Sequence, residues 1–270
     1  MSSTRVLRMG LSVLGTLVMV TLLSSPAWAQ DSPVVVVTGA VDVTNQYNFR
    51  GIRQNTDGVS IQPYIDFGFT PYKGDGGVKS VGINAGIWNA FNTQLDDKYY
   101  ERDLYATVGL GFSKGSLGMT YTSYTSPEDL FAHVKELAFK LGIDDSAALG
   151  KGALKPYALL AFELTDDGQA DAGAAKGKYL ELGIAPGYAG SKASLAVPVK
   201  VGLSAGDYYE FGGEDKTFGY FSVAGIVTVP INAHANIHFG GEFQAFGDSV
   251  KAYNGQDTAG IGSVGLGFAF

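Results

Sequence analysis

The chain has 270 residues, with 26 acidic and 19 basic side chains, 38 Gly, 15 Tyr, 16 Phe and no Cys. With 46% hydrophobic residues, it can bury enough apolar surface to fold, which excludes a disordered protein. The lack of Cys excludes disulfides and thiolate-bound metal or iron–sulfur sites, and a pI of about 4.9 argues against nucleic-acid binding. The Gly- and Tyr-rich composition favours an all-β protein over a helical enzyme.

Residues 1–29 have the features of an export signal. Arg5 and Arg8 precede an apolar run from Leu11 to Leu23, and Ala27-Trp28-Ala29 supplies the small residues that a signal peptidase accepts. A membrane anchor is the alternative, but the run is short for one. Cleavage would leave 26 acidic and 17 basic side chains, a net charge of −9. We therefore expect a signal peptide at 1–29 and one exported domain at 30–270.

From residue 35 onward, apolar and polar residues alternate with the period of two that places successive side chains on opposite faces of a strand. The predicted strands lie near 35–49, 59–69, 81–88, 103–112, 117–122, 136–141, 157–164, 179–184, 195–203, 220–229, 236–244 and 264–270. About twelve strands of membrane-spanning length leave no room for a second domain. An even number returns the chain to the side where it began, as in bacterial outer-membrane barrels.

The connections between the predicted strands alternate in length. The short ones are 113–115, 189–192 and 230–233, and the longer polar ones are 50–57, 92–100, 123–131, 165–177, 205–217 and 247–258. Short periplasmic turns and longer extracellular loops are typical of transmembrane barrels. The turn 141–153 departs from this rule, because it is long on the side that should be short.

A soluble β-sandwich also alternates, but it turns a face rich in Lys and Arg to water, and few of these residues occur in the predicted strands. The last strand ends in an alternating row that resembles the assembly signal of outer-membrane barrels, formed by Val264, Leu266, Phe268 and Phe270. The sequence thus predicts a single antiparallel transmembrane β-barrel of about twelve strands in the bacterial outer membrane. Its partners would be outer-membrane lipid and the barrel-assembly machinery. We expect an aromatic girdle at Tyr47, Phe49, Tyr121 and Phe270.

A resemblance to a known family lies in the first predicted strand. The segment Tyr47-Asn48-Phe49-Arg50-Gly51-Ile52-Arg53-Gln54 resembles the signature Tyr-x-Phe-Arg-Gly-Ile-x-Gln of the TorF-type porins of bacterial outer membranes. The stretch Ala85-Gly86-Ile87-Trp88 is similar to the second hairpin of that family. The resemblance implies a barrel and a pore, but it assigns no solute.

The polar strand faces should line the barrel interior. The predicted pore-lining residues are Asp42, Gln46, Arg50, Asp66, Asp103, Glu136, Lys140, Glu181, Lys200, His238 and Glu242. More carboxylates than cations would raise the local concentration of cations and repel anions. This predicts a porin-like channel for passive diffusion of small solutes with a weak cation preference.

Arg50, expected at the outer rim, is the candidate gate residue, with a rim salt bridge to a loop acid as its alternative. The alternative for the whole protein is a plugged structural or adhesive barrel whose acidic, aromatic loops, such as 207–210, bind a partner.

Catalytic motifs are weak. Gly260–Gly265 matches a dinucleotide-binding pattern and Gly202–Gly206 a nucleophile elbow, but neither precedes a helix as those motifs require. Of His133, His234 and His238, only His238 falls on a polar strand face, and a barrel-borne hydrolase would need Ser and an orienting group beside it. We therefore expect no enzyme activity, no catalytic residues and no cofactor.

Three pairs of acids could bind Ca²⁺ through carboxylate oxygens: Asp96-Asp97, Asp144-Asp145 and Asp166-Asp167. None has the spacing of an EF-hand, and Asp is common in turns. We predict no metal site and leave calcium bound by the loops open.

Overall fold

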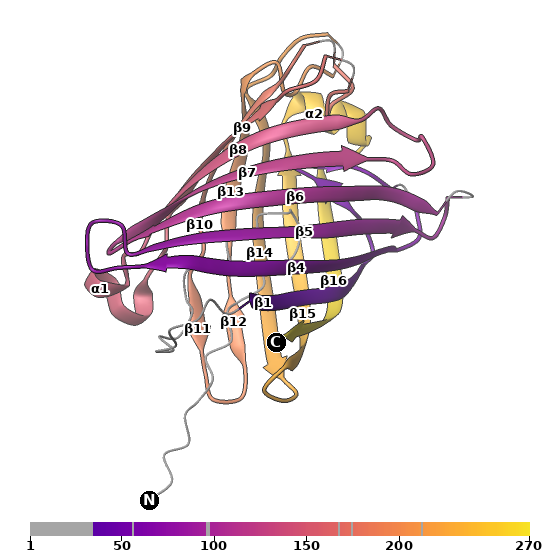
Figure 1. Ribbon diagram of the computed structural model, residues 1–270. Coiled ribbons are helices and arrows are strands. Elements are labelled where there is room, and N and C mark those ends of the chain that lie inside the picture. The colour runs from indigo at the N-terminus through magenta and orange to yellow at the C-terminus, as the bar shows by residue number, and fades with distance from the viewer. Residues whose placement is uncertain (1–34, 56, 96–97, 167, 174, 212) are drawn as a thin grey trace, which may run out of the picture.

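The computed structural model describes residues 35–270 except 56, 96–97, 167, 174 and 212. Twelve long antiparallel strands form a closed barrel (Figure 1), as predicted. They are β1 (Val35–Thr44), β4 (Ser60–Lys73), β5 (Ser80–Asn92), β6 (Tyr99–Phe112), β7 (Gly115–Thr125), β8 (Val134–Ile143), β9 (Tyr157–Glu163), β10 (Lys178–Ile184), β13 (Val199–Gly206), β14 (Phe218–Pro230), β15 (Ala235–Phe246) and β16 (Thr258–Ala269). The predicted signal peptide lies outside the described residues and stays a prediction.

Closure gives every wall strand two neighbours. Val43 of β1 pairs with Ile61 of β4 on one side and Val264 of β16 on the other, and the circle is completed through β15 and β14. Two wall strands are interrupted by proline, which cannot donate to the ladder. β10 continues past Pro186 as β11 (Gly187–Ala189), and β12 (Ser194–Ala196) continues past Pro198 as β13. Among the described residues β11 pairs only with β12, and each of the twelve wall strands has a partner on both sides, as a wall in lipid requires.

The barrel is polar inside and apolar outside. Along β6, Leu104 and Val108 point outward and are 51% and 40% exposed, whereas Asp103 and Tyr105 point inward and are 2% and 4% exposed. A soluble barrel would show the opposite distribution, so this wall is built for contact with lipid. The protein is an outer-membrane barrel.

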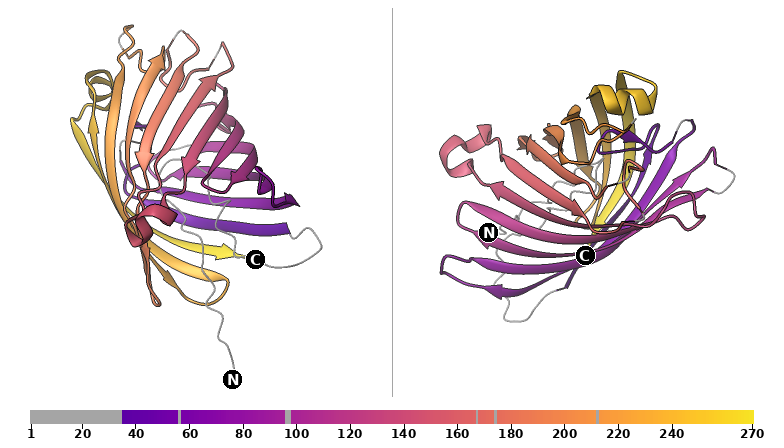
Figure 2. Two further views of the ribbon diagram at one scale, coloured as in Figure 1. Left: turned by 90° about the vertical axis from the view of Figure 1, so that its left-hand side faces the viewer. Right: turned by 90° about the horizontal axis from the view of Figure 1, so that it is seen from above.

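The two ends of the barrel differ. β1 begins and β16 ends at the end that carries the short turns 74–79, 113–114, 190–193 and 231–234, which we name the periplasmic end. The connections at the opposite, extracellular end are 45–59, 93–98, 126–133, 164–177, 207–217 and 247–257, and all but 93–98 are longer than these short turns. The predicted exception is present, because the turn 144–156 contains α1 (Ser146–Leu149) and the 3₁₀ helix η1 (Gly150–Gly152). Both views in Figure 2 place α1 at the periphery of the barrel.

The first extracellular connection corrects the predicted end of the first strand. β1 leaves the wall after Thr44 rather than running to residue 49, and the chain folds back into the barrel. There β2 (Asn48–Phe49) and β3 (Ile52–Arg53) form a small hairpin separate from the wall sheet. We call residues 45–55 the inserted hairpin.

The prediction of an aromatic girdle is therefore wrong for two of its four residues. Tyr47 is 8% exposed and packs inside the barrel against Trp88, and Phe49 stacks edge-on against Tyr124 at 5.3 Å. The alternation of apolar and polar residues continues past the end of β1 in the sequence, because Tyr47 and Phe49 also pack against apolar surroundings. Those surroundings are an aromatic interior instead of lipid. Tyr121 and Phe270 do face outward, at 41% and 68% exposure.

The helices are short. α2 (Asp248–Asn254) lies at the extracellular end and ends at Gly255, whose φ of 67° gives the left-handed C-cap that glycine favours. In the part of the chain that the structure describes, no helix is long and apolar enough to span a membrane.

The turn 144–156 should loosen in acid. Asp145 accepts hydrogen bonds from the backbone N–H groups of Lys155 and Leu154, each at 3.0 Å, and Asp144 accepts one from Ser146. The bond from Lys155 is the main reason that the pKa of Asp145 is below its usual value. A lowered pKa means that the stabilisation is present above the unfolded pKa of about 3.9 and is lost as pH falls through the folded value.

Hydrogen exchange, corrected for the intrinsic rate at each pH, should therefore show falling protection of the Leu154 and Lys155 amides below about pH 4. The Gly190 amide, which donates to the Ala193 carbonyl in another periplasmic turn, is the control. Equal loss of protection at Gly190 would contradict a role for Asp145.

Candidate functional site

The interior of the barrel is filled with charged and tyrosine side chains. Eight carboxylates lie on inward wall positions: Asp42, Asp66, Glu101, Asp103, Glu136, Glu163, Glu181 and Glu242. They face Arg50 of the inserted hairpin, Lys140 and Lys200 of the wall, and His238. Seven of the carboxylate residues are at most 7% exposed. The interior thus has an excess of acids and is closed to water where these residues lie.

Arg50 lies at the tip of the inserted hairpin. Phe49 pairs with Ile52, so Arg50 and Gly51 form a two-residue turn, and their φ angles are 49° and 84°. Positive φ at both residues is the requirement of a type I′ hairpin turn. At Gly51 a Cβ would also lie 3.0 Å from the Tyr220 ring. The Arg-Gly pair of the motif therefore has a structural reason, which is a turn pressed against the inner wall.

The guanidinium of Arg50 binds Glu136 of β8 through two hydrogen bonds, Nη1–Oε2 at 2.5 Å and Nη2–Oε1 at 2.7 Å. Nη1 also donates to the Tyr208 hydroxyl at 2.9 Å, and the guanidinium lies 4.1 Å from the centre of the Tyr179 ring. Both charged side chains are about 5% exposed or less. The predicted position at the outer rim is therefore wrong, and so is the alternative of a loop acid as partner. Arg50 lies inside and pairs with a wall carboxylate.

Other segments hold the hairpin in place. The Tyr209 hydroxyl donates to the Arg50 carbonyl at 2.9 Å, and the Asn254 side chain of α2 donates to the Gly51 carbonyl at 2.7 Å. At its base, the Tyr47 hydroxyl donates to Glu101 at 2.8 Å. Three regions distant in sequence thus fix the hairpin from both sides.

Glu181 is fully buried and accepts hydrogen bonds from three tyrosine hydroxyls of Tyr157, Tyr179 and Tyr220, at 2.8, 2.6 and 3.0 Å. The ammonium of Lys140 lies 4.0 Å from the centre of the Tyr157 ring. These contacts supply the donors that a buried carboxylate needs.

A second polar network joins the wall to the hairpin. Glu242 accepts a hydrogen bond from Gln244 at 2.9 Å and lies 4.0 Å from the Lys200 ammonium. Gln244 in turn accepts from Asn48 at 2.8 Å, and Asn48 accepts from half-buried Gln46 at 2.8 Å. Gln46 therefore lies in the hairpin and not on a wall strand.

Toward the periplasmic end, His238 Nε2 lies 2.5 Å from Asp42 Oδ1, and its Nδ1 lies 3.0 Å from Asn236. A Cβ at Gly265, which lies between their strands, would be in steric conflict with both Asp42 and His238. No serine hydroxyl is bonded to His238 in the described residues, so the pair is not part of a Ser-His-Asp arrangement. Asp66, another predicted wall acid, accepts a hydrogen bond from the Asn84 side chain at 2.7 Å.

Sequence reasoning missed several interior residues. Glu101 and Glu163 lie inside, and Glu101 could have been found because it is in phase with Asp103 on β6. Tyr179 is likewise in phase with Glu181. Tyr208 and Tyr209, 1% and 0% exposed, come from a connection without periodicity, which gives no signal of burial.

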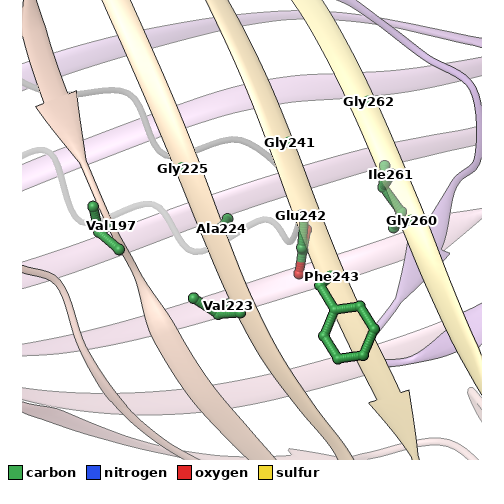
Figure 3. A pocket seen from close by; sticks show the side chains of 10 residues that line it. All are labelled: Val197, Val223, Ala224, Gly225, Gly241, Glu242, Phe243, Gly260, Ile261 and Gly262. Atoms are coloured by element: carbon green, nitrogen blue, oxygen red, sulfur yellow. The ribbon is translucent and has the colours of Figure 1, made fainter.

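A depression of about 590 Å³ lies in the outer wall rather than in the interior. Figure 3 shows it over β14, β15 and β16, where Gly225, Gly241 and Gly262 follow one another in register. These exposed positions lie in the row next to the pair of Val223 and Phe243. Because glycine has no side chain, these three positions leave a hollow in the lipid-facing surface. This hollow is not a path for polar solutes.

The remaining motifs are structural. Gly260–Gly265 lies within β16, and the Ser204 hydroxyl accepts the N–H groups of Gly206 and Tyr208. Among the described residues, no group of three or more His, Asp or Glu is placed to hold a metal ion. Asp166 pairs with Lys176, while Asp96, Asp97 and Asp167 lie outside the described residues.

No family model and no curated protein matches the chain. Among solved structures it is similar to outer membrane phospholipase A from Escherichia coli, with TM-score 0.49, 13% identity, and coverage of 86% of this chain and 92% of that one. It is also similar to the NanC porin, with TM-score 0.46, 12% identity, and coverage of 87% of this chain and 99% of that one. For the COG4313 outer membrane channel from Pseudomonas putida F1 the TM-score is 0.47 and the identity 11%, with coverage of 88% of this chain and 95% of that one. The TorF-type family stays a prediction.

Gly51→Ala should destabilise the barrel more than Gly255→Ala. Both glycines have positive φ, of 84° and 67°, but nothing lies within 4 Å of a Cβ at Gly255. Alanine should cost about 1 kcal/mol of unfolding free energy at Gly255 from its backbone alone, and about 2–4 kcal/mol at Gly51, where it also displaces Tyr220. Denaturant titration in lipid vesicles measures the unfolding free energy of both variants. Equal losses of unfolding free energy would show that Gly51 does not pack against Tyr220.

Proposed function

We propose that the protein is an outer-membrane channel for passive diffusion of small solutes, with a weak cation preference, and that the inserted hairpin closes it. The observation that supports this most directly is the origin of the interior charges. The eight carboxylates belong to the wall, whereas Arg50 belongs to the hairpin. A wall with an acidic surplus favours cations in any path that opens along it.

The closed state follows from burial. Glu181 and Tyr220 are 0% exposed and His238 is 2% exposed, although all three point into the barrel. Solutes therefore need the hairpin to move before they can pass these side chains. Breaking a buried ion pair costs about 3–5 kcal/mol when one partner is left alone, so the open state would be a minor population.

Movement of the hairpin would change the charge of the path as well as its width. When Arg50 withdraws, Glu136 loses its bidentate partner, and the fixed cations left on the wall are Lys140 and Lys200. The carboxylates then outnumber the lysines more strongly than in the closed state. Opening and cation preference are thus consequences of one displacement.

A second function is supported by the packed interior and by an exposed aromatic pair at the extracellular end. Phe211 and Tyr253 stack at 4.3 Å, and Tyr253 is 53% exposed. In this alternative the barrel stays plugged and its loops bind a partner. Recognition of the outward row from Val264 to Phe270 by the barrel-assembly machinery belongs to both alternatives.

Planar-bilayer recording under a KCl gradient tests the channel. The parent protein should give small, infrequent current steps with a reversal potential on the cation side. Arg50→Ala should raise conductance and strengthen cation preference, because Glu136 is left unpaired. Arg50→Ala/Glu136→Gln should also raise conductance, with a smaller gain in preference, and it avoids an uncompensated buried charge.

Arg53→Ala is the matched control, since it removes a positive charge from the same hairpin without touching Glu136; it should behave as the parent. Anion-side reversal potentials would contradict the cation preference. Silence of all variants in barrels that still show heat-modifiable migration would contradict the channel and favour the plugged alternative.

A further inference from the structure

The long periplasmic turn, residues 144–156, has no part in the proposed channel. It departs from the short turns at the same end, and neither α1 nor η1 contains a buried residue. Its backbone is nonetheless well fixed. Asp144 N–H donates to the Lys114 carbonyl of the neighbouring turn, and Ala185 N–H donates to the Leu154 carbonyl, at 2.9 and 2.8 Å.

The turn presents apolar side chains beside the lipid-facing wall. Leu149 and Leu154 are 51% and 43% exposed. Directly before the turn, Leu141 and Ile143 end the outward row of β8 and are 53% and 50% exposed. The outward apolar row of β8 therefore ends where the turn begins, and the turn adds Leu149 and Leu154 after the intervening Asp144 and Asp145.

Lysines occur in the same turn as these leucines and in the adjacent turn. Lys151 and Lys155 are exposed within the turn, and Lys114 is exposed in the adjacent one. Within the described ranges these three form no ion pair, whereas Lys176, Lys216 and Lys251 at the extracellular end pair with Asp166, Glu214 and Asp257. The periplasmic turns together carry Lys79, Lys114, Lys151, Lys155 and Lys192 against Asp75, Asp144 and Asp145.

The two acids of the turn are engaged by its own backbone. Asp145 accepts the N–H groups of Leu154 and Lys155, and Asp144 accepts that of Ser146. These bonds hold Lys155, whose φ is 50°, and fix the backbone of the turn that carries these leucines and lysines. Figure 2 shows α1 of this turn at the periphery of the barrel. An excess of lysine at this end of a chain with net charge −7 is complementary in charge to an anionic surface.

We infer that the periplasmic turn is an interfacial anchor that binds anionic phospholipid in the periplasmic leaflet. Leu149 and Leu154 enter the boundary between headgroups and acyl chains, as apolar faces of interfacial segments do. Lys151 and Lys155, with Lys114 beside them, contact the lipid phosphates, since Lys can extend its ammonium to the interface while its stem stays in apolar surroundings. This inference rests on the barrel and its orientation, and it holds whether or not the barrel conducts.

Hydrogen exchange of the mature protein in vesicles tests the anchor. Phosphatidylcholine vesicles with and without phosphatidylglycerol are compared over residues 146–155. Exchange should be several-fold slower when phosphatidylglycerol is present. Lys151→Gln/Lys155→Gln should abolish this difference, and Lys216→Gln/Lys251→Gln, which removes the same charge from the extracellular end, should retain it.

Two further experiments distinguish the apolar contribution of the leucines from binding of phosphate by the lysines. Leu149→Ser/Leu154→Ser should speed exchange in both kinds of vesicle, because it removes the apolar contribution. Inorganic phosphate added to phosphatidylcholine vesicles should not reproduce the protection. The inference is overturned if phosphate alone protects the turn, or if exchange is the same with and without phosphatidylglycerol in variants that fold as the parent does.

Discussion

The buried pair of Arg50 and Glu136 connects the fold of the first extracellular segment to the charge of the interior. Two parallel hydrogen bonds of 2.5 and 2.7 Å offset the desolvation of both groups, which only such geometry can do at this degree of burial. Because Arg50 is carried by the inserted hairpin, the position of the hairpin decides whether the acidic wall is partly neutralised. The shape and the electrostatics of the lumen therefore cannot change independently.

The hairpin tip is strained, and its neighbours compensate for the strain. Arg50 has a φ of 49°, a conformation that costs a non-glycine residue roughly 1–2 kcal/mol. Its own carbonyl accepts the Tyr209 hydroxyl, the next carbonyl accepts Asn254, and its guanidinium lies against the Tyr179 ring. The contacts come from separate extracellular connections and from the wall. A movement of any of these connections would weaken the restraint on Arg50.

The wall could be predicted from sequence because a closed barrel in lipid imposes a period of two on every strand. The outward rows of β6, β8 and β16 follow it. The inserted hairpin could not be predicted, since Tyr47 and Phe49 continue the alternation while facing an aromatic interior. Side-chain pairings between distant parts of the sequence were also hidden. Asp42 and His238 are 196 positions apart and Arg50 and Glu136 are 86 apart, and only closure and back-folding bring them together.

The composition of the interior bears on why the barrel is built this way. A barrel that serves only as a rigid support is better filled with apolar side chains, because replacing buried charges by hydrophobic groups is often neutral or stabilising. Here Glu181 requires three tyrosine hydroxyls, and Asp42 requires His238. Keeping these carboxylates demands a dedicated donor for each, which has no advantage in a permanently dry interior. Their retention is physically reasonable if water and cations reach the wall when Arg50 withdraws.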